Sequence, residues 1–479
     1  MIPLTLREIA QATGGRLHNA TGDETITGSV EFDSRKVTAG GLFIAVPGER
    51  VDGHDFAATA VQQGAAGVLA AREVDAPAVI VPPVDTSHGR AYVLAGDRDG
   101  SGAAVLAALA ALARAVVDRL PNLTVVGVTG SSGKTSTKDL ISQVLEPLGP
   151  TVAPPGSFNN ELGHPWTVLR ADESTRHLVL ELSARGPGHI RALCEIAPPN
   201  IGVVLNVGSA HLGEFGSQEG IARAKGELAE AASDAAVLNA DDPLVKGMAA
   251  RAKSRVVFVG KGQDVRAVDV QLDDQARATF RLVTPRGEAT VRLALHGEHH
   301  VGNALSAAAV ALELGATPED IAASLSSAQR RSARRMEVTT RGDGLTIVND
   351  SYNANPESMT AALKTLASMA GHERRTWAVL GVMAELGDNH AEAHEGIGRL
   401  AARLGVDRLV VVGEQAGAIQ HGARLEGSGT GEESVLVPDV EAAVALLDTE
   451  LRPGDVVLVK ASNAVGLWRV VDALLGSRA

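Results

Sequence analysis

Short apolar runs separated by polar turns recur along the whole chain, but the segments between them change along its length. Residues 1–95 contain GLFIAVPG, AAGVLA and PAVIVPP between polar turns, which predicts a small mixed α/β domain. In residues 96–330, the runs LTVVGVT, HLVLELS, IGVVLNV and RVVFVG alternate with helical stretches. That alternation predicts a mostly parallel sheet with helices on both faces.

A third series begins after the Arg-rich stretch QRRSARRME. The runs LTIVND, RTWAVLGVM, RLVVVGE and DVVLVKAS alternate with helices such as MTAALKTLASMA, which predicts a smaller Rossmann-like α/β domain at residues 331–479. A chain of 479 residues is long enough for several separate cores. We therefore predict an α/β protein of three domains.

Composition narrows the class of protein. The chain is 45% hydrophobic and 21% charged, as expected for a globular protein. Its net charge of −13 argues against nucleic acid bound on a broad basic face. Cys194 is the single cysteine, so an intrachain disulfide and a cysteine-clustered zinc site are excluded. We expect a cytoplasmic protein and a monomer.

No secretion signal or membrane span is expected from the sequence. The N-terminal stretch MIPLTLREIAQATGG lacks a basic run followed by an apolar core. Residues 103–117 come nearest to a span, but they are Ala-rich, contain Arg114 and are better interpreted as a buried helix. We therefore predict no stable membrane insertion.

A candidate phosphate-binding loop lies in TVVGVTGSSGKTSTKDLISQVL, residues 124–145, between a predicted strand and a predicted helix. Small residues at such a turn let backbone N–H groups and the helix N-terminus converge on an anion. Lys134 would reach the outer phosphates and Thr135 would complete a Mg²⁺ shell. The spacing GxxxxGK[ST] is not met, because Val128 stands where it requires glycine. The alternative is an ordinary helix start with a solvated lysine.

Three further residues are candidates for metal binding or catalysis. Glu181 and His211 follow predicted strands, and ligands of open α/β sheets collect at the carboxyl ends of strands. With Thr135 they could ligate Mg²⁺, although a helix cap and a satisfied loop histidine are alternatives. Lys225 lies in the predicted helix GSQEGIARAKGELAEAA, where a solvated lysine is the ordinary interpretation.

The motifs together resemble the Mur ligase family from about Asp33 to Lys460. The family's phosphate loop is the shorter TGxxGK[ST], which accounts for Val128. The resemblance implies an ATP-dependent amide ligase, most similar to the branch that joins D-alanyl-D-alanine to UDP-N-acetylmuramoyl-tripeptide. The matching stretches are DSRKVTAGGLFIAVPGERVDGHDF, TGSSGKTSTKDL, GSFNNELGHPWTVL, ELSARGPGHI, NVGSAHLGEFGSQEGIARAKGEL, NADDP, GEHHVGNALSAAA, NDSYNANPESM, VMAELG and VLVKAS.

The resemblance also assigns the catalytic centre. It places Lys134 on the phosphates of ATP, and Glu181 and His211 with Thr135 around Mg²⁺. Lys225 matches the lysine that Mur ligases carbamylate, which turns a cation into a carboxylate that helps to hold the metal. Carbamylation requires a neutral amine, so the surroundings of this lysine must disfavour its charged form.

For ATP, the resemblance implies contacts in two domains. It assigns Asn303 to adenine, Asp350 to the ribose and Arg335 to the phosphates, so that ATP would be shared across a cleft that closes. The phosphate-loop residues of the same site are Gly130, Ser131, Ser132, Gly133, Lys134, Thr135 and Ser136.

Substrate residues are likewise implied by the resemblance. One pair holds the uridine diphosphate end, a second group reaches toward the muramoyl peptide, and a third pair recognises the incoming dipeptide. In that order they are Ser34 and Arg35; Asn159, Asn160 and Ser183; and Tyr352 and Asn353.

Two motifs depart from the family pattern, and the sequence leaves other functions open as alternatives. The chain has VKASNAVGLW where relatives often have VKGSR, and GEHH replaces the commoner GxHN, so no role is assigned to Lys460 or His300. The alternatives are an earlier muramyl-peptide ligase, a folylpolyglutamate synthase, or a nucleotide-binding regulator without ligase activity. A folate enzyme would not need the first domain. The ligase that adds the third amino acid usually shows a DNPR-like motif, and this chain has NDSYNANP instead.

Overall fold

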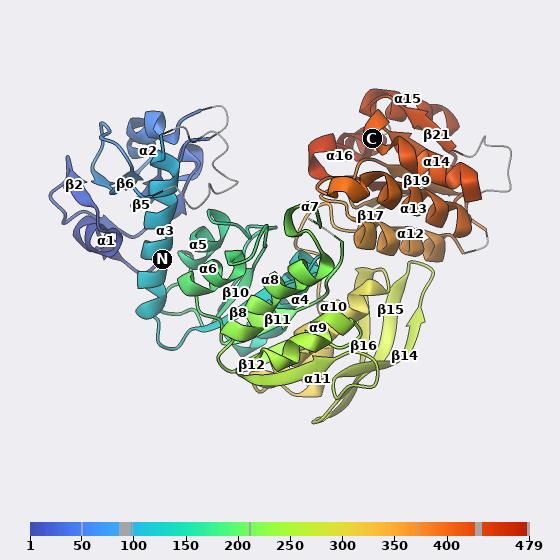
Figure 1. Ribbon diagram of the computed structural model, residues 1–479, viewed down its shortest axis with the longest axis horizontal. Coiled ribbons are helices and arrows are strands. Elements are labelled where there is room, and N and C mark those ends of the chain that lie inside the picture. The colour runs from blue at the N-terminus through green and yellow to red at the C-terminus, as the bar shows by residue number, and fades with distance from the viewer. Residues whose placement is uncertain are drawn as a thin grey trace.

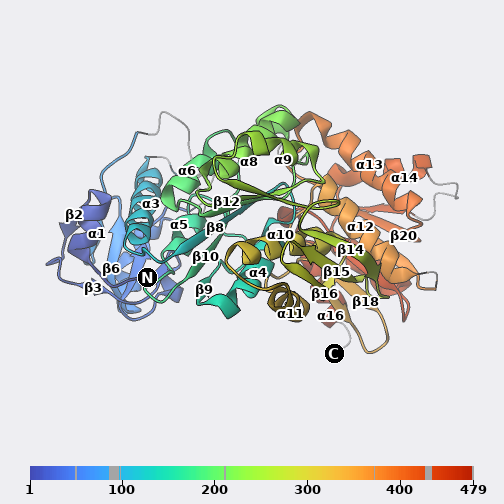
Figure 2. The same cartoon turned by 90° about the horizontal axis from the view of Figure 1, so that it is seen from below.

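The computed structural model describes residues 1–48, 51–85, 97, 99–209, 212–371, 373–426 and 434–476. The chain forms three α/β bodies in a row, with the N-terminal body at one end and the C-terminal body at the other (Figures 1 and 2). The predicted α/β class and three-domain architecture are confirmed. The exact boundaries at residues 95 and 330 stay a prediction.

The first body is built on a five-stranded mixed sheet, and its β2–β7 pair is antiparallel. Helix α1 (Leu6–Thr13) begins with a capping box, in which Thr5 and Glu8 bond each other's backbone, and ends at Gly14 with φ of 65°. A separate antiparallel pair joins β1 (Leu4–Thr5) to β3 (Thr25–Ile26). The remaining elements are β4 (Val30–Glu31), β5 (Gly41–Ile44), β6 (Ala65–Ala70), β7 (Ala78–Ile80), β2 (Arg16–His18) and α2 (Ala57–Gln62).

The central body is a parallel six-stranded sheet in the order β13-β12-β11-β8-β10-β9. Alternate residues of one strand serve opposite faces, because successive side chains of a strand point in opposite directions. In β8, Val125 joins the core beneath α3, α6 and α8, whereas Val126 and Val128 join the core beneath α4, α10 and α11. The strands are β8 (Thr124–Thr129), β9 (Thr151–Val152), β10 (His177–Glu181), β11 (Ile201–Val204), β12 (Ala235–Asn239) and β13 (Arg255–Val259).

Helices cover both faces of this sheet, as the alternating pattern predicts. They are α3 (Ser101–Asp118), α4 (Lys134–Leu145), α5 (Gly163–Val168), α6 (His189–Ile196), α7 (Leu212–Phe215), α8 (Gln218–Ala231), α9 (Pro243–Gly247), α10 (His299–Glu313) and α11 (Pro318–Ser327).

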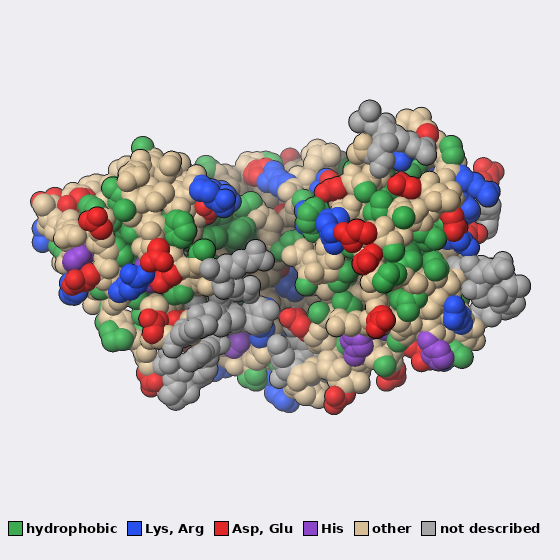
Figure 3. Space-filling model, turned by 90° about the horizontal axis from the view of Figure 1, so that it is seen from above, with side chains coloured by type: hydrophobic (Ala, Val, Ile, Leu, Met, Phe, Trp, Pro, Cys, Tyr) green, Lys and Arg blue, Asp and Glu red, His purple; other side chains and the backbone are tan. Residues whose placement is uncertain are grey.

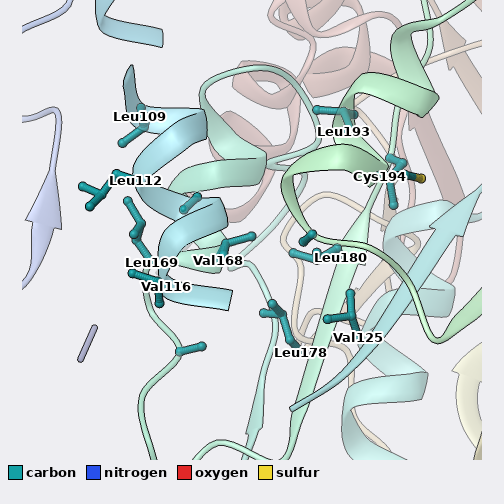
Figure 4. Close-up of a cluster of buried hydrophobic side chains, with 14 of the residues drawn as sticks. Leu109, Leu112, Val116, Val125, Val168, Leu169, Leu178, Leu180, Leu193 and Cys194 are labelled. Atoms are coloured by element: carbon teal, nitrogen blue, oxygen red, sulfur yellow. The ribbon is translucent and has the colours of Figure 1, made fainter. Parts of the chain in front are cut away.

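Helix α3 is the described helix that is long and apolar enough to cross a membrane by length and composition, and half of its apolar window is buried. Its side chains Leu109, Leu112 and Val116 lie in a cluster with residues of α5, α6, β8 and β10 (Figure 4). The same core includes Leu6 and Ile9 of α1. Helix α3 therefore joins the first body to the central one, as a buried helix rather than a separate apolar segment.

A three-stranded antiparallel sheet follows the parallel one, which the sequence analysis did not distinguish. It consists of β14 (Arg266–Leu272), β15 (Arg277–Thr284) and β16 (Gly287–His296), in that order. Phe280, Leu282 and Val291 turn one face of it toward the core beneath α10 and α11.

The third body is a six-stranded sheet in the order β17-β18-β22-β19-β20-β21, parallel except at the β17 edge. This is the predicted Rossmann-like arrangement. Its strands are β17 (Glu337–Thr340), β18 (Thr346–Asn349), β19 (Thr376–Leu380), β20 (Arg408–Val412), β21 (Ser434–Val437) and β22 (Val456–Lys460), and its helices are α12 (Pro356–Ala370), α13 (His390–Arg403), α14 (Gly417–Glu426), α15 (Val440–Glu450) and α16 (Trp468–Gly476).

Candidate active site

The phosphate-loop sequence forms a tight turn between the end of β8 and the start of α4. Gly133 has φ of 79°, a conformation that favours glycine, and a Cβ there would lie 2.9 Å from Asn303 Oδ1 and displace that side chain. Lys134 Nζ donates to Gly130 O at 2.7 Å. Val128, which breaks the longer loop spacing, lies buried inside β8. The loop is the shorter form that the family resemblance implies.

Glu181 ends β10, the strand beside β8, and its carboxylate is fully engaged. Its Oε2 accepts from Thr135 Oγ1 at 2.9 Å. Its Oε1 accepts from Ser157 Oγ at 2.9 Å and from Asn159 Nδ2 at 2.8 Å. The strand end therefore gathers a carboxylate, hydroxyl groups and an amide at the phosphate loop. The interpretation of Glu181 as a helix cap is wrong.

Lys225 is buried in α8, with 6% of its surface exposed, so the interpretation as a solvated lysine is wrong. Among the described residues, none accepts a hydrogen bond from its amine. Burial lowers the pKa of Lys225 well below its usual value, the nearby charge of Lys134 adds to this, and Glu357 opposes it. Burial also lowers the pKa of Lys134. The site thus favours a neutral amine at position 225.

His211, the remaining predicted metal ligand, lies outside the described residues. Its role stays a prediction. Within the described ranges, no group of three or more His, Cys, Asp or Glu side chains is placed to hold a metal ion.

The third domain faces the phosphate loop with Arg335, which donates to Thr135 Oγ1 at 3.3 Å and lies over the Tyr352 ring at 4.1 Å from its centroid. Asp350, at the end of β18, accepts from Met336 N at 3.1 Å. The buried ammonium of Lys460 pairs with Asp350 and also donates to Asn353 O at 2.8 Å. Lys460, to which no role was assigned from the sequence, thus supports the ribose candidate Asp350.

A cavity of about 1180 Å³ lies between the central and third domains. It brings together most of the residues that the sequence analysis singled out, from segments far apart in the chain. Those that line it are Ser131, Ser132, Gly133, Lys134, Thr135, Ser136, Asn159, Glu181, Ser183, Asn303, Arg335, Asp350, Tyr352 and Asn353.

Several predicted residues do not line this cavity. Gly130 and Lys225 are not among its lining residues, and Asn160 Oδ1 caps the turn before α5 by accepting from Gly163 N at 2.9 Å. Ser34 is buried in a short turn, and the exposed Arg35 pairs with Asp33 at 2.8 Å. These two residues adjoin, without lining, a second cavity of about 780 Å³ between the first and central domains.

Sequence reasoning missed Glu357, in the first turn of α12, although it also lines the large cavity. Its Oε1 accepts from Ser209 N at 2.7 Å and from Ser209 Oγ at 3.0 Å, across 148 residues of chain. From sequence alone, an acid at the start of a helix is interpreted as a charge that stabilises the helix dipole. No local sequence pattern indicates its contact with Ser209.

The fold and this cavity define a three-domain α/β protein with a candidate phosphate-binding loop facing the third domain. Three family models match it: "Mur ligase family, catalytic domain" at residues 27–115, "Mur ligase middle domain" at 128–311, and "Mur ligase, glutamate ligase domain" at 334–463. The chain belongs to the Mur ligase family.

Named relatives are similar over their full lengths. The UDP-N-acetylmuramoyl-tripeptide–D-alanyl-D-alanine ligase of Mycobacterium bovis is 57% identical, over 99% of this chain and 98% of that protein. The ligase of the same name from Mycobacterium leprae is 53% identical, over 100% and 99%.

Solved structures agree with this family. MurF from Acinetobacter baumannii is 32% identical and superimposes with a TM-score of 0.84, over 99% of both chains. MurF ligase from Thermotoga maritima, solved in complex with ADP, is 31% identical with a TM-score of 0.77, over 95% of this chain and 99% of that one.

Proposed function

We propose that this protein is an ATP-dependent amide ligase that joins D-alanyl-D-alanine to UDP-N-acetylmuramoyl-tripeptide, giving the pentapeptide precursor of peptidoglycan, ADP and phosphate. The observation that carries the proposal is the cavity between two domains, with Lys134 and Glu181 on one wall and Arg335 and Asp350 on the other. The full-length identity of 57% to a relative named for this reaction supports the choice of substrates.

ATP would lie across the cavity. Its phosphates would contact residues 130–136 and Arg335, because backbone N–H groups and cations converge there. Asn303 borders Gly133 and would contact adenine, and Asp350, fixed by Lys460, would contact the ribose. The ADP bound by the Thermotoga maritima relative supports a nucleotide site in this fold.

Magnesium fits the groups at the end of β10. The oxygens of Thr135 and Glu181 meet at 2.9 Å, and hydroxyl and carboxylate oxygens are ligands that Mg²⁺ prefers. His211 and, once carbamylated, Lys225 would complete the set; the low pKa of the buried Lys225 amine favours that modification. When bound, the metal would neutralise phosphate charge.

The reaction would proceed in two steps. The terminal carboxylate of the tripeptide attacks the γ-phosphorus of ATP, ADP leaves, and an acyl phosphate forms. Lys134 and Arg335 stabilise the charge that develops on the transferred phosphoryl group. The deprotonated amine of D-alanyl-D-alanine then attacks the acyl carbon and expels phosphate. Enclosure between two domains would keep water from the acyl phosphate.

Phosphate release tests this proposal. The purified protein with ATP and Mg²⁺ would receive the uridine-linked tripeptide and D-alanyl-D-alanine separately and together, with product mass recorded. We expect release only with both, and a product heavier by one dipeptide less water. Release with a single amino acid or with a folate in place of these substrates would instead establish a different ligase of the same fold.

A cytoplasmic location, a monomeric state and the absence of a nucleic-acid partner complete the proposal. Acidic and basic side chains are intermixed on the face in Figure 3, where neither sign forms a broad patch. The single cysteine, Cys194, is buried, which suits a reducing compartment.

A further inference from the structure

The carboxylate of Glu357 is held by Ser209 and packs against Gly208, both of the central domain. Its Oε1 is held by Ser209 N at 2.7 Å and Ser209 Oγ at 3.0 Å. A Cβ on Gly208 would lie 2.3 Å from Glu357 Cδ, so only glycine leaves room for the carboxylate. Gly208 N also donates to Ser131 Oγ of the phosphate loop at 2.8 Å. These contacts through Gly208 and Ser209 therefore fix Glu357 relative to the phosphate loop.

The second oxygen of the Glu357 carboxylate makes no hydrogen bond to a described residue. Oε2 of Glu357 is buried, and no described residue donates a hydrogen bond to it. A buried carboxylate oxygen without a partner is costly, and such an atom in a native fold calls for an explanation. Because Glu357 lines the large cavity, a ligand in that cavity is the natural partner.

The other charged groups around the cavity already have partners. Among the other acids that line the cavity, Glu181 accepts three hydrogen bonds, Asp350 pairs with Lys460, and Glu385 also has an interaction partner. Among the cations, Lys134 donates to Gly130 O and Arg335 donates to Thr135 Oγ1. A positively charged ligand group in the cavity would therefore find the carboxylates of Glu181 and Asp350 already hydrogen-bonded or paired, whereas Glu357 Oε2 can still accept a hydrogen bond.

The electrostatic influence of Glu357 also reaches Lys225, but no hydrogen bond joins the two side chains. Lys225 lies outside the lining of the cavity, whereas Glu357 borders it. Glu357 thus borders the cavity, and its buried Oε2 is the one oxygen of its carboxylate that no described residue engages.

We propose that Glu357 Oε2 binds the amino group of the incoming dipeptide, in its ammonium form, through a charge-assisted hydrogen bond. The inference rests on the proposed function, since it requires a second substrate with a free amino terminus. Ser209 holds one oxygen so that the other is oriented before the substrate arrives, and hydrogen bonds that involve charged partners are the strong ones.

The test compares two nucleophiles on one acyl phosphate. Wild type, Glu357→Gln and Ser209→Ala would receive ATP, Mg²⁺ and the uridine-linked tripeptide, with either D-alanyl-D-alanine or hydroxylamine. Hydroxylamine is largely uncharged at neutral pH, and it displaces phosphate to give a hydroxamate. Dipeptide product and hydroxamate would both be measured by mass, and the melting temperature of each variant would establish folding.

We expect Glu357→Gln to raise the KM for the dipeptide by about 10-fold or more, from loss of a charged hydrogen bond. Its hydroxamate rate should fall far less than its rate of dipeptide ligation, because glutamine still accepts from Ser209. Ser209→Ala, which loosens the carboxylate but keeps its charge, should give a smaller rise in the dipeptide KM.

Two outcomes would overturn the inference while leaving the ligase intact. One is an unchanged dipeptide KM in Glu357→Gln. The other is an equal loss of hydroxamate and dipeptide product, which would make Glu357 a support for the loop at Ser209. If wild type forms neither hydroxamate nor ligation product, the proposed function itself fails.

Discussion

At the residue scale, His164 couples stability to pH. It is 1% exposed, and burial lowers its pKa to about 4, although the nearby backbone of Leu193 and Glu181 acts in the opposite direction. The folded state therefore resists protonation, whereas the unfolded chain takes up a proton below about pH 6.5. Because the unfolded state binds more protons between those values, this contribution to stability is present at neutral pH and is lost as pH falls toward 4.

We expect wild type to lose about 2 kcal/mol through His164 between pH 7 and pH 5. His164→Met, which keeps a buried side chain without a titrating group, should remove that part of the loss. Urea denaturation at both pH values measures the difference. Equal pH dependence in wild type and variant would show that His164 is not the group responsible.

Local structure at the candidate site was predictable where the signal was local. The strand, the turn of small residues and the helix around Lys134 together predict a phosphate loop, and the structure has that turn between β8 and α4. Its binding of phosphate stays a prediction. Lys225 is different, because physics alone favoured a solvated side chain and only the family resemblance marked it. Its burial comes from packing of α8 in the folded domain, and Glu357 meets Ser209 only through tertiary structure. No short-range sequence pattern marks either the burial of Lys225 or the contact between Glu357 and Ser209.

At the element scale, α13 and α14 cross so closely that only glycine fits between them. A Cβ on Gly398 would lie 1.8 Å from Ile419 O, and a Cβ on Gly422 would lie 2.0 Å from Glu395 O. The obstacles are backbone atoms, which cannot rotate away. Gly398→Ala must therefore push the helices apart.

We expect Gly398→Ala to destabilise the third domain by roughly 2–3 kcal/mol, as overpacking of a close contact does. Gly396→Ala is the matched control on the same helix, since Gly396 has nothing within 4 Å of a built Cβ. There alanine should be neutral or stabilise by up to about 1 kcal/mol, because it is the better helix former. Chemical denaturation would measure the free energy of unfolding of both variants. Similar values for Gly398→Ala and Gly396→Ala would refute the close crossing of α13 and α14.

The strands of the two largely parallel sheets were predictable because they are buried on both faces. The alternation of apolar runs and helices predicted both parallel sheets, because buried strands read as continuous apolar runs. The antiparallel sheet β14–β16 was missed. Its strand β14 is largely exposed from Asp269 to Leu272, so it shows no apolar run to mark it.

At the scale of the whole molecule, the linker from the central to the third domain is fastened to α4. Gln143 Nε2 donates to Gln329 O at 2.9 Å, and Gln329 N donates back to Gln143 Oε1 at 2.9 Å. Arg331 forms an ion pair with Glu146, the residue that directly follows the end of α4. Because α4 begins at the phosphate loop, these contacts set the position of Arg335 relative to Thr135.

Loosening this attachment should weaken nucleotide binding more than folding. In the double variant Gln143→Ala with Arg331→Ala, both truncated side chains are partly exposed in wild type, so each substitution should destabilise the domains by no more than about 1 kcal/mol. The two walls of the ATP site would then be held less firmly, and ATP would have to order them on binding. We expect the Kd for ATP, measured by calorimetry, to rise several-fold, about 3- to 10-fold for a loss near 1 kcal/mol.

Arg399→Ala provides the control, because Arg399 forms partly exposed ion pairs with Glu395 and Glu426 within the third domain. Its Kd for ATP should equal that of wild type. If the linker variant also binds ATP as wild type does, the domain arrangement does not depend on α4. If instead it unfolds at markedly lower urea while Arg399→Ala does not, the linker supports folding rather than the alignment of the two walls.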